Sequence, residues 1–113
     1  AVIAAFRPLD PATDVVLGQF QGYTDIDGVA VGSMQDTFVA ARLWIDTDRW
    51  RGVPFVLRTG KRMARKAQRI TLVMRRPDGP LAGAIDQPST IEIDFSGPGA
   101  ITLGVTLNAP GPD

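Results

Sequence analysis

The sequence predicts a single domain over residues 1–113. This domain consists mainly of a β-sheet of about six strands, most of them antiparallel, with little helix. Short apolar or alternating segments follow one another along the chain, and no convincing ten-residue amphipathic helix separates them. Consecutive strands with short connections pair antiparallel, whereas parallel strands need long crossovers that are usually helical. The hydrophobic fraction of 44% over 113 residues is that of one globular domain, so one compact core is expected.

Two segments alternate between apolar and polar residues, which is the pattern of a half-buried strand. The apolar positions are Ile70, Leu72 and Met74 within 68–75, and Ile91, Ile93 and Phe95 within 89–95. A turn at 97–99, with the sequence GPG, then leads into 100–107 and predicts a hairpin.

Three earlier segments, 15–20, 37–45 and 53–58, are predicted as strands from residue type and length. The run TFVAARLWI at 37–45 mixes helix-favouring with strand-favouring residues, and its nine residues favour a strand. The glycine- and aspartate-rich stretch 22–32 predicts an exposed loop. Residues 1–14 contain prolines that fit neither the inside of a regular helix nor a central strand, so they are expected to be a connector.

Composition excludes most catalytic chemistry. The sequence contains neither cysteine nor histidine, which excludes disulfides, thiol nucleophiles, Cys/His zinc sites and imidazole acid–base catalysis. No secretion signal and no apolar run of about 20 residues is present, so a cytoplasmic location without membrane contact is expected. Twelve basic and twelve acidic residues balance and give no reason to expect a nucleic acid partner.

The basic residues are concentrated, since eight of the twelve lie within 58–76, where no acidic residue occurs. Lys61 and Lys66, in TGKRMARK after a predicted strand, can converge with Arg62 or Arg65 on an anion, and phosphate is the natural guest. The glycine before Lys61 permits close approach of the backbone. A solvated positive edge, which deters pairing between sheet edges, explains the same residues, so both interpretations stay open.

Other motifs point to structure rather than chemistry. Asp25 with Asp27 and Asp46 with Asp48 could hold a hard cation, but aspartates in such turns more often bond to the backbone two residues on, so no metal site is predicted. The GK pair lacks the earlier glycine and the following Ser or Thr of a P-loop. GPGAITLG is no dinucleotide fingerprint, because no helix follows it.

One block is far more specific than these short motifs. Residues 48–61 read DRWRGVPFVLRTGK and resemble RWxGVPFxLRTGK, a signature of the C-terminal domain of the glucose-6-phosphate 1-dehydrogenase family. Supporting matches are Gly18-Gln19-Phe20 to the family's GQY, Ser33 with Asp36-Thr37-Phe38 to its S-x-T-E-T-F, and Ala109-Pro110-Gly111 to its K-x-PG region. Together they cover roughly residues 8 to 111.

The resemblance implies an NADP-dependent oxidation of glucose 6-phosphate at C1 to the lactone, the entry step of the oxidative pentose phosphate pathway. In that family an N-terminal Rossmann domain binds NADP and supplies the catalytic His with its Asp partner. This segment alone is therefore expected to be inactive and free of NADP. Residues 1–14 are expected to connect it to that missing domain. The family's C-terminal domain is α+β, with a large antiparallel sheet that makes the dimer contact, which implies a homo-oligomer through the sheet.

The resemblance also assigns residues. Lys61 matches the family's GK lysine, which contacts the substrate, and Lys66 matches a second basic substrate contact, so both are expected to bind glucose 6-phosphate. The positions that would hold a second, structural NADP carry Ala67, Thr71 and Asp94, which leaves only Arg58 of that basic set. A second nucleotide is therefore not expected.

Departures from the family motivate an alternative function. The family's QPxE segment aligns with 96–99, where Ser96 and Gly99 replace its polar pair, and the loop after GQF is shorter. These changes suggest a non-catalytic paralogue that acts as an interaction or assembly module. The basic run alone motivates a generic anion-binding sheet domain. A sheet without covering helices exposes apolar surface, so the chain by itself is expected to self-associate or to have reduced solubility.

Overall fold

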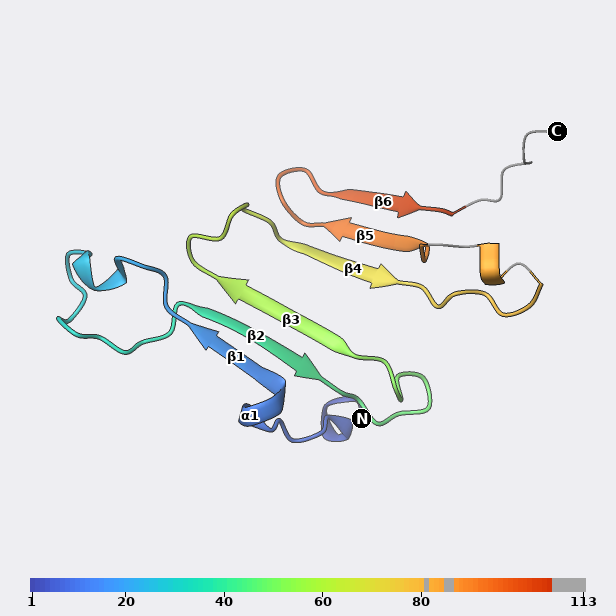
Figure 1. Cartoon of the computed structure of the whole chain (residues 1–113), viewed down its shortest axis with the longest axis horizontal. Coiled ribbons are helices and arrows are strands. Elements are labelled where there is room, and N and C mark those ends of the chain that lie inside the picture. The colour runs from blue at the N-terminus through green and yellow to red at the C-terminus, as the bar shows by residue number, and fades with distance from the viewer. Residues whose placement is uncertain (81, 85–86, 107–113) are drawn as a thin grey trace. The chain divides into compact units, whose positions relative to one another are not determined.

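The computed structural model describes residues 1–80, 82–84 and 87–106 of the chain. The chain forms two compact units, Ala1–Ala64 and Arg65–Asp113, each with one three-stranded antiparallel sheet (Figure 1). Six strands and little helix confirm the predicted fold class. The strands pair as two separate sheets of three rather than as one meander of six.

The first sheet consists of β1 (Val15–Gly18), β2 (Phe38–Leu43) and β3 (Phe55–Gly60), in that order. All three predicted strands are confirmed, with ends shifted by up to two residues. Phe38 pairs with Gly18 on one side and with Gly60 on the other. The last residues of β1 and β3 therefore lie on either side of the first residue of β2.

The connector contains a short helix that its prolines were expected to prevent. Helix α1 (Pro11–Asp14) begins at Pro11, where a missing N–H is not needed and the fixed φ suits the helix. The Asp10 side chain caps it by accepting a hydrogen bond from the Ala12 amide at 3.0 Å. The sequence did not predict this helix, because a proline at the first helical position is compatible with a helix that it would break further along. Single turns of 3₁₀ helix lie at Ile3–Ala5, Tyr23–Asp25 and Ala82–Ala84.

A bidentate ion pair fastens the N-terminal segment to the end of β2. Arg7 donates from Nε to Asp46 Oδ2 at 2.7 Å and from Nη2 to Oδ1 at 2.8 Å. Its amide donates to the Trp44 carbonyl at 3.0 Å, and its guanidinium lies 5.7 Å from the Trp44 ring centre. Ile45, next to this contact, is the one buried hydrophobic residue among those described. The expected single compact core is therefore not seen in the described part of the chain.

This ion pair predicts an acid sensitivity. The hydrogen bond from Arg7 holds the pKa of Asp46 below its ordinary value of 3.8. The stabilisation is complete above about pH 4 and is lost as the pH falls from 3.8 through the lower folded pKa. We expect Asp46→Asn to reduce the loss of thermal stability between about pH 5 and about pH 3. Asp48→Asn is the control, because its pair with Arg51 is long, at 3.8 Å, and exposed, and should leave that loss unchanged.

The second sheet consists of β4 (Arg69–Val73), β5 (Thr90–Asp94) and β6 (Ala100–Gly104). Cross-strand partners share a face, so the register separates an apolar face from a polar one. The apolar face comprises Ile70, Leu72, Ile91, Ile93, Ile101 and Leu103. Ile101 is 72% exposed and Leu103 65%. The predicted alternation is confirmed, and the last residue of the predicted strand 100–107 lies outside the described residues.

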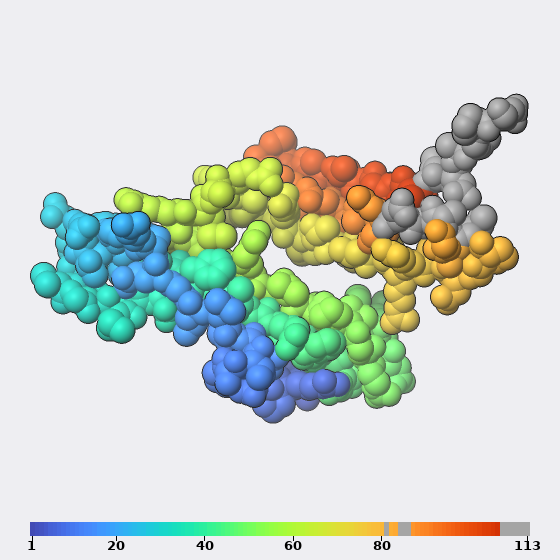
Figure 2. Space-filling model, viewed as in Figure 1, coloured from blue at the N-terminus to red at the C-terminus, as the bar shows by residue number. Residues whose placement is uncertain are grey.

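The loop between β1 and β2 extends from the end of the first sheet, where Figure 2 shows it in blue to turquoise. The Gln19 side chain donates from Nε2 to the carbonyls of Ser33 at 2.8 Å and Gln35 at 2.9 Å. This clamp closes the loop at its base and leaves much of its tip exposed, as predicted. No helix in the described part of the chain is long and apolar enough to cross a membrane.

Candidate functional site

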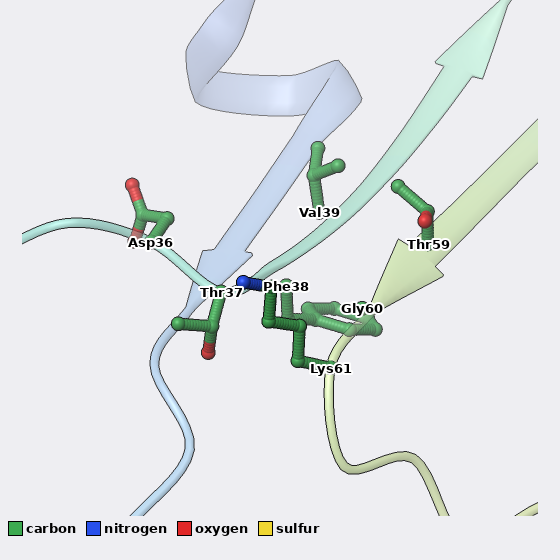
Figure 3. Close-up of a pocket in the computed structure, with 7 residues that line it drawn as sticks. All are labelled: Asp36, Thr37, Phe38, Val39, Thr59, Gly60 and Lys61. Atoms are coloured by element: carbon green, nitrogen blue, oxygen red, sulfur yellow. The ribbon is translucent and has the colours of Figure 1, made fainter. Parts of the chain in front are cut away.

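A shallow hollow lies at the end of the first sheet where β1 and β3 end and β2 begins (Figure 3). Its volume is about 350 Å³, and it is lined by Asp36, Thr37, Phe38, Val39, Thr59, Gly60 and Lys61. The lining residues include one ammonium, one carboxylate, two hydroxyls and one aromatic ring. A cation with neighbouring polar groups suits a small phosphorylated and hydroxylated molecule.

Lys61 is the first residue after β3 and remains attached to the sheet. Its amide donates to the Thr37 carbonyl at 2.9 Å, and the Thr37 amide donates to the Gly18 carbonyl at 2.8 Å. Hydrogen bonding across the three strands thus continues beyond the last register pair. The side chain of Lys61 is exposed, so a backbone position fixed by the sheet carries an ammonium that solvent and ligand can reach.

Gly60 makes room for an aromatic ring. A Cβ added at Gly60 would lie 2.9 Å from Phe38 Cδ2 and 2.9 Å from Met63 Sδ, closer than van der Waals contact permits. A Cβ at Gly18, on the other side of Phe38, would lie 3.7 Å from Phe38 Cδ1. The sequence predicted close approach of backbone at this glycine. In the structure the side chains of Phe38 and Met63 occupy the space beside Gly60, and approach of an anion to this backbone stays a prediction.

Arg62 turns away from the predicted anion cluster. Its φ of 52° lies in the left-handed region, which non-glycine residues rarely adopt. Its guanidinium carbon lies 4.7 Å from the centre of the Phe20 ring, within cation–π distance. Phe20 in turn packs edge-on against Tyr23 at 5.4 Å. Arg62 therefore binds the loop beside the hollow.

Lys66 lies in the second unit, whereas Lys61 lies in the first. Its side chain is exposed, as are those of the other residues from Lys61 to Ile70. An exposed lysine is free to meet an anion. The convergence of Lys66 with Lys61 stays a prediction.

Ser96 and Gly99, which replace the family's polar pair, form a tight turn after β5. The Ser96 amide donates to Asp94 Oδ1 at 2.7 Å, and the Ser96 hydroxyl donates to the same oxygen. These bonds hold the pKa of Asp94 below its ordinary value. Gly97 and Gly99 have φ values of 57° and 78°, which confirms the predicted GPG turn. The Ser96 side chain therefore stabilises the turn.

The carboxylates of Asp46 and Asp48 pair with arginines. Asp46 binds Arg7 instead of the backbone two residues on, and Asp48 lies 3.8 Å from Arg51. Among the described residues, no group of three or more His, Cys, Asp or Glu side chains could hold a metal ion. Ala109, Pro110 and Gly111, which carry part of the resemblance, lie outside the described residues.

Sequence reasoning missed the roles of Thr37 and Gln19 at this site. Thr37 and Gln19 entered only as residues of predicted strands and of matched motifs. Both act through hydrogen bonds to backbone groups, which leave no trace in hydrophobic periodicity or charge. The available signal was their position, since both stand at strand ends beside the basic turn.

Comparison with known proteins agrees with the resemblance. The family model for the C-terminal domain of glucose-6-phosphate dehydrogenase matches residues 1–113. Glucose-6-phosphate 1-dehydrogenase 1 of Mycobacterium tuberculosis (strain CDC 1551 / Oshkosh) is 45% identical over 75 residues, which is 66% of this chain and 16% of that protein. A probable glucose-6-phosphate 1-dehydrogenase of Schizosaccharomyces pombe is 33% identical over 93 residues, covering 82% of this chain and 20% of that protein.

A solved structure shares the fold. The crystal structure of glucose-6-phosphate 1-dehydrogenase from Mycobacterium avium superposes with a TM-score of 0.86 at 32% identity, over 96% of this chain and 25% of that one. The chain thus spans a quarter or less of the length of these relatives. Sequence, fold and family match agree, and the chain belongs to the glucose-6-phosphate dehydrogenase C-terminal domain family.

Proposed function

We propose that this chain is the substrate-binding and oligomer-forming part of an NADP-dependent glucose-6-phosphate 1-dehydrogenase, which oxidises glucose 6-phosphate to 6-phosphogluconolactone. The observation that carries the proposal is the hollow at the end of the first sheet, which Lys61 lines. Thr37, Phe38, Gly60 and Lys61 belong both to this hollow and to the motifs that mark the family.

In this reaction the chain positions the substrate. Lys61 neutralises and orients the sugar phosphate, because an ammonium on a flexible stem makes charge-assisted hydrogen bonds to phosphate oxygens. Lys66 supplies a second positive charge. NADP bound by another part of the enzyme would supply the hydride acceptor, and a base outside this chain would remove the proton of the C1 hydroxyl. Holding the substrate in one orientation is this chain's contribution to rate.

The described residues do not fit a second, structural nucleotide. Thr71 donates its hydroxyl to Glu92 at 3.4 Å, and the Asp94 carboxylate accepts from Ser96. Two acidic side chains on this face of the second sheet oppose a phosphate-rich ligand. Arg69, on the same face, is paired with Glu92 at 3.5 Å. No step of the reaction is therefore assigned to a nucleotide on this chain.

The test is NADP reduction by the full-length protein that carries this segment, with glucose 6-phosphate as substrate. We expect turnover by the full-length protein and none by the isolated chain. A folded full-length protein without activity would favour the non-catalytic paralogue. Equal affinity for sulfate and for glucose 6-phosphate would favour a generic anion site, because a substrate site also recognises the sugar hydroxyls.

The proposed oligomer forms through the sheet, and the isolated chain tests whether its apolar face associates. We expect the wild-type chain to self-associate in sedimentation velocity, because Ile101 and Leu103 are exposed side by side with other aliphatic residues. Ile101→Lys should shift the chain towards monomer. Thr102→Lys adds the same charge to the opposite face of the same strand and should leave association through the apolar face in place. A wild-type monomer at high concentration would contradict this expectation.

A further inference from the structure

Thr37 joins three segments at the hollow. Its amide donates to the Gly18 carbonyl at 2.8 Å, at the end of β1. Its carbonyl accepts from the Lys61 amide at 2.9 Å, just after β3. Its hydroxyl oxygen accepts from the Phe20 amide at 2.9 Å, in the loop that follows β1. One residue thus binds the ends of β1 and β3 and the loop that follows β1.

Only the hydroxyl bond depends on the side chain. Any residue except proline could make both backbone bonds of Thr37, but the bond from Phe20 requires a short side chain with an acceptor oxygen, such as the hydroxyl of Thr or Ser. That bond is partly buried, so an apolar replacement leaves the Phe20 N–H without a partner and with reduced access to water. The loss therefore falls mainly on the position of Phe20.

Phe20 is connected to Lys61 through Arg62. The Arg62 guanidinium lies 4.7 Å from the Phe20 ring centre, and Arg62 follows Lys61 directly. Two interactions thereby hold Lys61 in place. Its own amide donates a hydrogen bond to Thr37, and the next residue, Arg62, makes a cation–π contact with Phe20. The left-handed backbone of Arg62, with φ of 52°, directs the chain into this second contact. Thr37, Phe20, Arg62 and Lys61 form a closed ring of contacts.

We propose that Thr37 is a positioning residue for Lys61. Its hydroxyl fixes Phe20, Phe20 holds Arg62, and the turn so formed keeps the Lys61 backbone at one distance from the sugar phosphate. The inference rests on the proposed function of Lys61 as a substrate ligand. A lysine side chain has several rotatable bonds, so a mobile backbone beneath it spreads the ammonium over many positions and weakens binding.

The experiment compares Thr37→Val with Thr37→Ser in the full-length protein, with NADP reduction as the assay. We expect Thr37→Val to raise KM for glucose 6-phosphate about ten-fold, with kcat within about two-fold of wild type. Thr37→Ser restores the acceptor and should return KM to within about two-fold of wild type. Thr47→Val is the matched control, because the buried Thr47 hydroxyl has no hydrogen-bond partner. KM should not change in that variant.

A second variant covers the case in which Thr37→Val does not fold. Arg62→Asn removes the guanidinium and keeps a residue type that tolerates positive φ. It should raise KM about two- to five-fold at unchanged kcat, as expected for loss of an exposed cation–π contact. A wild-type KM in both Thr37→Val and Arg62→Asn, or no rescue by Thr37→Ser, would overturn the inference.

Lys61→Ala, measured alongside, separates this inference from the function beneath it. If Lys61→Ala loses activity while Thr37→Val matches wild type, the positioning role is wrong and the proposed function stands. If Lys61→Ala matches wild type, the substrate role of Lys61 is wrong, and the positioning role of Thr37 is overturned with it.

Discussion

Replacing Lys61 with alanine is expected to lower kcat/KM for glucose 6-phosphate by about 10- to 150-fold in the full-length protein, the range that corresponds to losing a charge-assisted hydrogen bond. The ammonium follows β3 directly and lies at the hollow, with its backbone bonded to Thr37. Alanine leaves the phosphate without this partner, and water replaces it poorly because it carries no charge. Steady-state NADP reduction across a range of substrate concentrations gives the measurement.

Arg75→Ala is the matched control for charge. Arg75 belongs to the same basic run and is exposed, but it lies outside the hollow. A specific site predicts wild-type kinetics in this variant, whereas a generic positive surface predicts a loss comparable to that of Lys61→Ala. Lys61→Arg keeps the charge in a different shape and should recover only part of the activity.

Gly60→Ala is expected to destabilise the sheet end and to raise KM for glucose 6-phosphate. The new methyl group would lie 2.9 Å from both Phe38 Cδ2 and Met63 Sδ. Met63 has a flexible side chain that can move, but the Phe38 ring is held between two neighbouring strands. Overpacking of this kind costs about 1–3 kcal/mol, which a lower midpoint of thermal unfolding would report. Because Lys61 is the next residue, the displacement should also reach the proposed substrate site.

Gly18→Ala provides the comparison on the other side of the same ring. A Cβ there would lie 3.7 Å from Phe38 Cδ1, which is ordinary van der Waals contact. We expect a markedly smaller effect on the unfolding midpoint and on KM than from Gly60→Ala. Combining Gly60→Ala with Phe38→Leu should recover part of the lost stability, because the smaller side chain vacates the contested space. Equal effects from Gly60→Ala and Gly18→Ala would contradict this account.

The strands were predictable because their cause is local. Alternation in 68–75 and 89–95 separates an apolar face from a polar one, and the structure shows strands within both segments. The division into two sheets was not predictable, because residue patterns mark strands without naming their partners. The helix at Pro11 was missed because the same proline begins or breaks a helix according to its position.

The charge of the site was predictable, but the contacts that hold its residues in place were not. A glycine followed by lysine at a strand end indicated Lys61, and the structure places this residue at the hollow. Thr37 and Gln19 could not be found in this way, since a hydroxyl or amide that bonds to backbone depends on where the chain returns in space. Arg62 was expected beside the lysines, and its contact with Phe20 depends on a backbone conformation that sequence does not report.

The Phe38 ring between Gly18 and Gly60 also limits how this end of the sheet can change during evolution. The two glycines and the ring share one volume, so a larger residue at position 60 is tolerable only with a smaller one at position 38. At position 18 a Cβ has room, so a larger residue there does not require a change at position 38. The pair 38 and 60 should therefore covary across relatives while position 18 drifts independently, which ties the identity of the residue before Lys61 to an aromatic residue 22 positions earlier in the chain.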